Sequence, residues 1–383
     1  MSVLGSDILV IGGGMAGASI AAHLSERAKV HLLEMEEQPG YHSTGRSAAL
    51  FTEAYGNATI RTLTRASRPF LFSPPAGFAA IPLVKPRPVL IFGQASRRDA
   101  FEDYARREPD LERVSAKRAL ELCPVLQPDG LLGGVLDNST ADIEVHELQR
   151  GYLRILKQRG GQITTNARVT GLIRETDGWT VEVGAAKYRA AIVVNAAGAW
   201  ADDVGQLARA LPIGLKPLKR TAALIEPPAG LSCEDWPMIL DAEEAFYMKP
   251  DARLLMLSPA DETPAVPSDV QPDELDIAIA IDRVEHATTL QVRRVRSKWA
   301  GLRSFVGDRS PVVGYDPLQP GFFWLAALGG YGIQTAPALS ILAASLVLER
   351  SVSAEIAPFE ICRDEMSPTR FLLEAPADRR AHR

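Results

Sequence analysis

A glycine-rich turn near the N-terminus constrains the fold more than any other feature of the sequence. Residues 12–17 read Gly-Gly-Gly-Met-Ala-Gly and match the pattern G-x-G-x-x-G. The apolar run 7–11 before them predicts a buried strand, residues 15–27 have a helical pattern, and residues 29–34 predict a second strand. This order of elements predicts one mononucleotide-binding half of a Rossmann-like fold.

Each glycine of the motif has its own physical role. Gly12 permits the tight turn after the strand, Gly14 lets backbone N–H groups approach a pyrophosphate, and Gly17 lets helix and strand pack closely. Glu34 closes the second strand, where its carboxylate can accept hydrogen bonds from both ribose hydroxyl groups. Because this carboxylate favours an unphosphorylated ribose, it indicates FAD or NAD, and not NADP.

The segment after Glu34 favours FAD. Residues 38–49 read Gln-Pro-Gly-Tyr-His-Ser-Thr-Gly-Arg-Ser-Ala-Ala, which are mostly small or polar. They could form a surface loop, or a loop that passes the flavin and whose small residues permit close backbone approach. Residues 194–200, Val-Asn-Ala-Ala-Gly-Ala-Trp, form a second strand-to-glycine turn, which ordinary packing would also explain. With NAD as the cofactor, the segment 38–49 would have no purpose.

Composition excludes several other classes of protein. The 383 residues include 42 Lys and Arg against 47 Asp and Glu, and a net charge of −5 gives no general positive field for nucleic acid. Cys123, Cys233 and Cys362 lack the spacing of metal ligands or of a disulfide framework, so we expect no metal and a cytoplasmic location. The apolar run 336–348 is shorter than the ~20 residues of a membrane span, so we expect no transmembrane segment.

The remaining sequence alternates between two patterns. Elements typical of a nucleotide-binding domain are predicted at residues 148–159 (helix), 162–175 and 179–183 (paired strands), 191–195 and 322–327 (strands) and 332–348 (helix). Between them, residues 221–258 alternate as antiparallel strands do, and residues 275–290 predict a helix. These patterns predict an α/β fold with an interleaved α+β substrate domain that contains an antiparallel sheet.

The predicted division of the chain is discontinuous. The FAD-binding domain is expected at residues 1–82, 144–213 and 304–383, and the substrate-binding domain at residues 83–143 and 214–303. The cleft between two such domains is the expected ligand site.

Several motifs together resemble the D-amino-acid-oxidase-like family of FAD-dependent oxidoreductases, nearly from end to end. Besides the segments 38–49 and 194–200, they are 246–251 (Phe-Tyr-Met-Lys-Pro-Asp), 299–305 (Trp-Ala-Gly-Leu-Arg-Ser-Phe) and 329–335 (Gly-Gly-Tyr-Gly-Ile-Gln-Thr). Within this family, the bacterial FAD-dependent D-arginine dehydrogenases are the most similar. The resemblance implies a Rossmann-like FAD-binding domain of the glutathione-reductase type.

The resemblance also implies which residues hold FAD. They come from the glycine motif, the acidic strand end, the small-residue loop and the last glycine turn: Gly12, Gly14, Ala16, Gly17, Glu34, Met35, Ser43, Thr44, Gly45, Arg46, Ser47, Ala48, Val169, Gly198, Gly330, Gly332, Ile333 and Gln334. Relatives with covalent flavin carry a cysteine near residues 307–314 or the last glycine loop, and this chain has none there. We therefore expect non-covalent FAD.

The same resemblance implies a substrate site. Arg220 and Arg303 are expected on the substrate carboxylate, because the planar guanidinium fork can bind a carboxylate through two hydrogen bonds. Tyr55 and Tyr247 are expected around the amino group and the side chain, which completes the candidate catalytic set. The backbone carbonyl of Gly330 is expected near the amine.

Two departures from the D-arginine dehydrogenases concern the side-chain pocket, which Gln334 is also expected to line. Leu50 stands where those enzymes have a histidine, and Val89 stands where they have a glutamate. Val89 cannot accept a hydrogen bond, so a cationic group buried beside it would be unpaired, at a cost of a few kcal/mol. Leu50, Phe51 and Val89 therefore predict an apolar wall. Glu53 could restore an acid, although its loop position favours a solvated charge.

The expected reaction is the oxidative deamination of a D-amino acid. Hydride passes from Cα to flavin N5, and the imino acid hydrolyses to a 2-oxo acid and ammonia. No His–Asp pair is required, and His42 could either touch the cofactor or be a structural histidine. Two alternatives stay open: oxidation of secondary amino acids such as sarcosine, proline or hydroxyproline, and a non-catalytic flavin-binding subunit. The electron acceptor (quinone or O2) and the oligomeric state (monomer or homodimer) are also open.

Overall fold

A six-stranded sheet forms the centre of the first region in the computed structural model, which describes residues 4–372. In spatial order its strands are β10 (Gln162–Thr164), β3 (Val30–Leu33), β2 (Ile8–Ile11), β14 (Ile192–Asn195), β22 (Phe322–Ala326) and β21 (Val312–Tyr315). Every neighbouring pair is parallel except β21 with β22. The strands β2, β3 and β22 are buried throughout, which explains why their sequences are apolar apart from His31 in β3.

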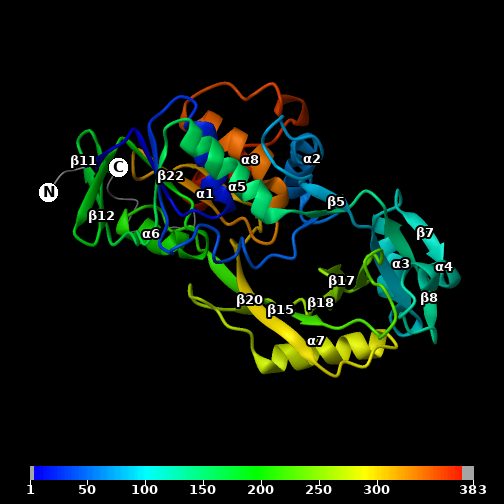
Figure 1. Cartoon of the computed structure of the whole chain (residues 1–383). Coiled ribbons are helices and arrows are strands. Elements are labelled where there is room, and N and C mark those ends of the chain that lie inside the picture. Colours follow the sequence, from blue (N-terminus) through cyan, green and yellow to red (C-terminus); the bar gives the residue numbers. More distant parts are fainter. Residues whose placement is uncertain (1–3, 373–383) are drawn as a thin grey trace.

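Helices cover one face of this sheet, and a second sheet covers the other (Figure 1). The helices are α1 (Met15–Leu24), α2 (Ala58–Phe72), α5 (Val145–Gln158) and α8 (Gly332–Val347). The second sheet has the order β1 (Leu4–Gly5), β13 (Ala186–Ala190), β12 (Gly178–Val183) and β11 (Gly171–Glu175), with α6 (Ala201–Leu207) beside it. Ile8 and Val10 pack with the helices, whereas Leu9 and Ile11 pack on the other side, because side chains alternate along a strand.

The second region is built on a nine-stranded sheet. Its strands are β19 (Thr263–Pro264), β15 (Lys216–Ile225), β18 (Leu254–Ser258), β17 (Tyr247–Asp251), β16 (Met238–Asp241), β6 (Val89–Gln94), β8 (Leu131–Asp137) and β7 (Glu112–Ser115), with β20 (Val295–Phe305) paired to β15. Its helices are α3 (Arg98–Arg107), α4 (Ala116–Leu122) and α7 (Glu274–Ala287). A small sheet of β4 (Leu50–Phe51), β9 (Ala141–Ile143) and β5 (Val84–Pro86) accompanies them. Short 3-10 turns are η1 (Ala95–Arg97), η2 (Gly198–Trp200), η3 (Ala357–Phe359), η4 (Asp364–Met366) and η5 (Pro368–Phe371).

The two faces of the nine-stranded sheet have different neighbours. Helix α7 runs along one face (Figure 1), where it packs against alternate residues such as Ala223 and Leu257. The residues between them, such as Ala222, Met256 and Tyr247, form a separate apolar cluster on the opposite face. Ala222 and Tyr247 also line the cavity described below, so this second face belongs to the candidate site.

The predicted fold class is confirmed, with three local corrections. Residues 162–175 do not form one strand: Asn166 has a φ of 53°, and β10 and β11 on either side of it belong to different sheets. The nine-stranded sheet is mixed, since β16 pairs parallel to β6. Helix α1 ends at Leu24, three residues before the predicted end.

The predicted domain boundaries stay a prediction, and the last of them, 304–383, extends beyond the described residues. No helix in the described range is long and apolar enough to span a bilayer.

Candidate active site

A large cavity lies at the carboxyl ends of the parallel strands. Its lining includes Ile11 at the end of β2, Leu33 and Glu34 where β3 ends, Ala196 after β14 and Ala326 at the end of β22. It encloses about 1720 Å³ of empty space, part of which is open to solvent. Ligands of open α/β sheets bind at this edge, so the cavity is the candidate site.

The glycine turn at the cavity floor tolerates no side chain at two positions. Gly12 has a φ of +101°, and a Cβ there would lie 2.4 Å from the carbonyl oxygen of Ala196. A Cβ on Gly17 would lie 1.8 Å from the carbonyl oxygen of Gly12. Gly17 therefore holds helix and turn together and does not itself line the cavity.

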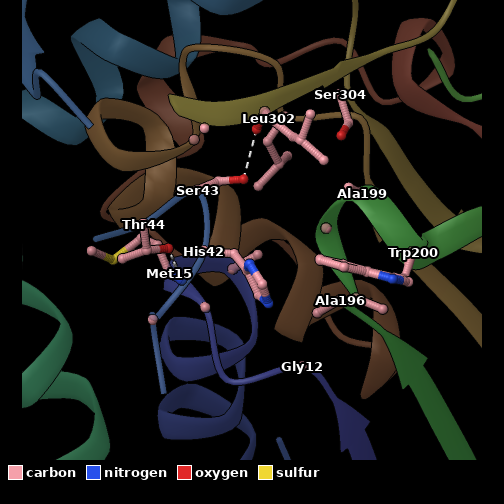
Figure 2. Close-up of a pocket in the computed structure, with 18 of the residues that line it drawn as sticks. Gly12, Met15, His42, Ser43, Thr44, Ala196, Ala199, Trp200, Leu302 and Ser304 are labelled. Carbon is pink, nitrogen blue, oxygen red and sulfur yellow. Dashed lines mark hydrogen bonds between the residues drawn. The ribbon is translucent and has the colours of Figure 1, made fainter. Parts of the chain in front are cut away.

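Polar groups fix the first turn of α1 and the acidic strand end. The Glu34 carboxylate accepts hydrogen bonds from the backbone N–H of Gly13 at 2.7 Å and of Glu36 at 2.9 Å. The Thr44 hydroxyl accepts one from the backbone N–H of Met15 at 3.0 Å (Figure 2). These contacts hold the beginning of α1, where N–H groups lack partners within the helix, against the cavity.

The segment 38–49 is attached to β20 and is not a free surface loop. The Ser43 hydroxyl donates to the carbonyl of Leu302 at 2.6 Å (Figure 2). Arg46 donates to the carbonyl of Ala300 at 2.9 Å, and the Trp299 indole donates to the carbonyl of Arg46 at 3.0 Å. The loop therefore carries its small residues along the cavity wall.

His42 belongs to the cavity wall and has protein partners on two sides. Its Nε2 lies 2.8 Å from a carboxylate oxygen of Glu36. Its ring centre is 4.6 Å from that of Trp200, and Figure 2 shows the two side chains facing each other. These contacts account for the position of the imidazole without a catalytic role.

Most residues predicted to bind FAD line the cavity. They are Gly12, Gly14, Ala16, Glu34, Met35, Ser43, Thr44, Arg46, Ser47, Ala48, Val169, Gly198, Gly330, Gly332 and Ile333. Gly17, Gly45 and Gln334 are not in the lining. The Gln334 amide is 4% exposed, accepts from the backbone N–H of Thr52 and donates to Thr64, which attaches α8 to α2. Its structure-supporting contacts leave the predicted ligand role untested.

Arg220 and Arg303 meet because of strand register. In the antiparallel pair β15–β20, Arg220 lies opposite Gly301, two residues from Arg303, so the two arginines are diagonal neighbours. Both line the cavity, together with Tyr247 from β17. A Cβ on Gly330 would lie 3.0 Å from the guanidinium carbon of Arg303, so a side chain there would require the guanidinium to shift by a few tenths of an ångström.

The arginine pair leaves positive charge facing the cavity. Burial, and then the nearby charge of Arg303, lower the pKa of the Arg220 guanidinium. Arg220 donates to the carbonyl of Asp261 at 2.8 Å and lies 3.3 Å from a carboxylate oxygen of Glu262. Within residues 4–372, Arg303 forms no ion pair. Two neighbouring guanidinium groups with so little compensating charge have the chemistry to bind an anion.

Tyr55 lies beside this pair but not in the cavity lining. Its ring centre is 4.9 Å from that of Tyr331. Burial acts to lower the pKa of Arg303, but the adjacent phenol groups of Tyr55 and Tyr247 raise it above its ordinary value. The structure thus brings together all four residues of the predicted catalytic set.

The apolar wall stays a prediction, since the cavity lining includes none of its three residues. Leu50 and Val89 belong to the same apolar cluster as Tyr247, behind the cavity surface. Phe51 is fully buried on the opposite side of β4, among the helices, because neighbouring residues of a strand face opposite ways. Glu53 forms an ion pair with Arg68 at 3.2 Å and is about a third exposed, and it is not in the cavity lining.

Some cavity residues carried no signal in the sequence. Arg168, Asp203 and Leu207 line the cavity but belong to no motif. Glu262, which pairs with Arg220, lies in the segment between β18 and α7 and is equally unmarked. Only the folded chain brings these residues to the site.

A sequence model of one family, described as FAD dependent oxidoreductase, matches residues 7–346. The chain belongs to this family. The predicted D-amino-acid-oxidase-like family and its cofactor, FAD, are thereby confirmed. The particular similarity to D-arginine dehydrogenases stays a prediction.

Known relatives of this FAD-dependent oxidoreductase act on different molecules. Glycerol-3-phosphate dehydrogenase 1 of Mycobacterium tuberculosis is 27% identical over 330 residues, which is 78% of this chain and 63% of that protein. The chain thus spans less than two thirds of that relative's length. Glycine oxidase from Geobacillus kaustophilus superposes with a TM-score of 0.79 at 19% identity, covering 94% of this chain and 99% of that one. L-proline dehydrogenase from P. horikoshii gives 0.79 at 19% identity, covering 97% and 99%. Such structural likeness shows the shared fold.

Proposed function

We propose that this FAD-dependent oxidoreductase oxidises the Cα–N bond of a small amino acid, with D-amino acids that carry neutral, hydrophobic side chains as the preferred substrates. The observation that carries the proposal is the guanidinium pair of Arg220 and Arg303 in the cavity. A pair of guanidinium forks suits a carboxylate, the group that every amino acid presents. Glycine oxidase and L-proline dehydrogenase, which share the fold, act on amino acids.

The residues that line the cavity suit one orientation of FAD. The pyrophosphate would lie at the N–H groups that begin α1, beside Gly12 and Gly14, where a Cβ on Gly12 would collide with Ala196. Glu34, at the end of β3, would accept hydrogen bonds from the ribose. The flavin would extend toward Arg303 and Gly330, which line the same cavity. We propose that the cofactor is held without a covalent bond.

The protein's own groups would bind and orient the substrate. FAD, when bound, accepts the hydride that leaves the substrate carbon. Arg220 and Arg303 would fix the carboxylate, and the carbonyl of Gly330 would accept a hydrogen bond from the amine. Tyr55 and Tyr247 would close the site around the amine and side chain and exclude water. Such fixation raises the rate because the substrate loses its translational and rotational freedom when it binds, and not in the reaction step that follows.

The preference for neutral side chains rests on the cluster of Leu50, Val89 and Tyr247. A buried ammonium or guanidinium group there would lack a negatively charged partner, because none of the three side chains is a carboxylate. We expect D-Leu, D-Met and D-Phe to have higher kcat/KM values than D-Arg.

Anaerobic reduction of the purified yellow protein tests the proposal. The panel contains D- and L-amino acids, sarcosine, proline, hydroxyproline and glycerol 3-phosphate, and the readout is bleaching of flavin absorbance. Bleaching by D-Leu, D-Met or D-Phe supports the proposal. Faster reduction by D-Arg contradicts the side-chain preference, and reduction by glycerol 3-phosphate alone would overturn the substrate class.

Arg303→Ala tests the anion site directly. We expect kcat/KM for the best amino acid to fall by roughly 10²-fold or more, because a charged hydrogen bond is lost in a site away from bulk water. Bound flavin, measured as the absorbance ratio at 280 and 450 nm, should stay near that of the unmodified protein. Unchanged turnover in this variant would contradict the proposed role of the pair.

The same measurements decide between the two other functions. Preferential reduction by sarcosine, proline or hydroxyproline would show a secondary-amine enzyme that uses the same arginines. A protein that binds FAD and is reduced by no member of the panel would behave as a non-catalytic flavin-binding subunit. Reoxidation of reduced protein by air or by a quinone would then identify the electron acceptor.

A further inference from the structure

Glu262 connects the arginine pair to a third arginine. One of its carboxylate oxygens lies 3.3 Å from Arg220 and 2.8 Å from Arg309, and the other lies 3.0 Å from Arg309. The Arg309 guanidinium is itself fixed, with its carbon 3.9 Å from the ring centre of Phe305. The Glu262 carboxylate therefore accepts hydrogen bonds from both Nη atoms of Arg309 and from Nη2 of Arg220.

The backbone around Glu262 is tied to β15, which keeps the carboxylate in place. The carbonyl of Asp261 accepts a hydrogen bond from Nε of Arg220 at 2.8 Å. The carboxylate of Asp261 accepts from the backbone N–H of Thr221 at 2.7 Å and from its hydroxyl at 3.0 Å. The strand that carries Arg220 thus also positions Glu262.

The donors that remain match one carboxylate. Arg220 uses Nε on the carbonyl of Asp261 and one Nη2 hydrogen on Glu262, and its Nη1 hydrogens have no partner among residues 4–372. Arg303 lines the cavity and forms no ion pair within residues 4–372, although the Tyr55 phenol lies within hydrogen-bonding reach of its guanidinium. Arg309 has both arms on Glu262. A second acid group near Arg309 would have to displace Glu262 and would meet its negative charge.

Glu262 stays charged at the pH values at which such an enzyme works. Hydrogen bonds from Arg309 lower the pKa of its carboxyl, and the positive charges of Arg220 and Arg303 act in the same direction. About a third of its side chain is exposed, so solvent screens its field and the effect on a ligand is moderate.

From this geometry we propose that Glu262 determines the charge of the acids that the pocket accepts: it fills the position of a second anionic group and restricts the site to molecules with one carboxylate. The proposal rests on the proposed function, in which Arg220 and Arg303 bind the substrate carboxylate. Loss of the Glu262 charge would free the Arg309 fork and open the pocket to dicarboxylates.

Two unreactive four-carbon acids, butyrate and succinate, test this in the FAD-bound protein. Their Kd values are measured from the change in flavin absorbance and independently from the rise in Tm. In Glu262→Gln we expect the ratio of the succinate Kd to the butyrate Kd to fall roughly tenfold, because a screened charge is removed near the second carboxylate. If the substitution also makes Arg220 more mobile, the Kd values of both acids change alike and their ratio is unaffected. Glu262→Ala provides a second neutral replacement should the glutamine variant fold poorly.

Three further variants of this protein test whether the change in the Kd ratio is due to the charge of Glu262. Glu102→Gln removes a similar carboxylate that pairs with Arg113 at 3.1 Å on the exposed side of α3, and its ratio should equal that of the unmodified protein. Glu262→Asp keeps the charge and should keep the ratio. The double variant Glu262→Gln with Arg309→Gln lacks the freed fork and should lose the gain for succinate.

The failure of this proposal can be distinguished from the failure of the proposed function. If butyrate binds the unmodified protein but both neutral variants keep its Kd ratio, the role of Glu262 is overturned and the acid site stands. If neither acid binds the unmodified protein, the acid site itself is overturned and the role of Glu262 with it.

Discussion

Single residues decide whether the cavity floor can form. Gly12 combines a left-handed backbone with contact to the carbonyl of Ala196, and the two constraints act together. A residue with a side chain there must change both the turn and the neighbouring strand end. The glycine pattern in the sequence indicated this position, and the geometry supplies the cause.

Gly12→Ala should destabilise the protein by about 2–4 kcal/mol and weaken FAD binding, because a Cβ would lie 2.4 Å from a backbone oxygen. The measurements are the free energy of unfolding in urea and the FAD content after gel filtration. Gly307→Ala is the matched control, since a Cβ there meets nothing within 4 Å. Equal behaviour of the two variants would show that the turn can relax.

His23 on α1 predicts a dependence of stability on pH. Its ring lies 6.0 Å from that of Tyr152 on α5, and burial, with the charge of Arg159, lowers its pKa to about 4. The unfolded chain, with an ordinary histidine pKa near 6.5, binds more protons between these values. Stability should therefore fall as the pH drops from about 6.5 toward 4, by roughly 1–3 kcal/mol.

His23→Leu removes this titration. Unfolding in urea at pH 7.5 and pH 5 should show a smaller loss of stability for the variant than for the unmodified protein. An equal loss in both would mean that other groups cause the acid sensitivity.

At the scale of elements, the candidate active site depends on hydrogen bonds between loops and strands. The segment 38–49 is bound to β20 through Ser43, Arg46 and Trp299. Arg46 also donates to the carbonyl of Val270 at 3.1 Å and pairs with Asp269, so it fastens a second loop. One side chain thus connects two segments beside the cavity.

Arg46→Ala should weaken FAD binding by roughly tenfold, because both loops lose their common attachment to β20. The Kd is measured by the recovery of flavin fluorescence on dilution, and limited proteolysis should show faster cleavage near residue 269. Arg296→Ala, also on β20, removes only an exposed pair with Glu226 and should change neither readout. Wild-type affinity in Arg46→Ala would indicate that the loop is held by Ser43 and Trp299 alone.

At the scale of the whole molecule, the cavity wall is shared by two regions. Gly12 and Glu34 come from the six-stranded region, whereas Arg220 and Tyr247 come from the nine-stranded sheet. A ligand that fills this space touches both regions and stabilises them together. FAD is therefore expected to contribute to the stability of the entire protein.

Removal of FAD should lower the Tm by several degrees. Free FAD at about 100 times its Kd stabilises the folded state by ~2.7 kcal/mol, and the Tm should rise with the logarithm of its concentration. Thermal unfolding followed by tryptophan fluorescence, in apoprotein and with added FAD, checks this. An unchanged Tm would mean that the cavity is equally stable when empty.

The sequence by itself determined the nucleotide-binding unit, because its signals are local: an apolar run, a glycine turn and a helix follow one another within residues 7–34. It also indicated the family, through motifs whose residues are contiguous. It mispredicted residues 162–175, where the left-handed Asn166 separates strands of two sheets, because pairing partners are distant in the chain.

Tertiary structure alone decided how the site is assembled. Arg220 and Arg303 are 83 residues apart and meet only through the register of β15 and β20. Leu50 and Phe51 pack in two different apolar clusters, and how β4 is packed decides which residue joins which cluster. Glu262 reaches Arg220 because a loop outside every motif folds back on β15. Local patterns specify elements, whereas charge and shape at a site depend on contacts between residues far apart in the chain.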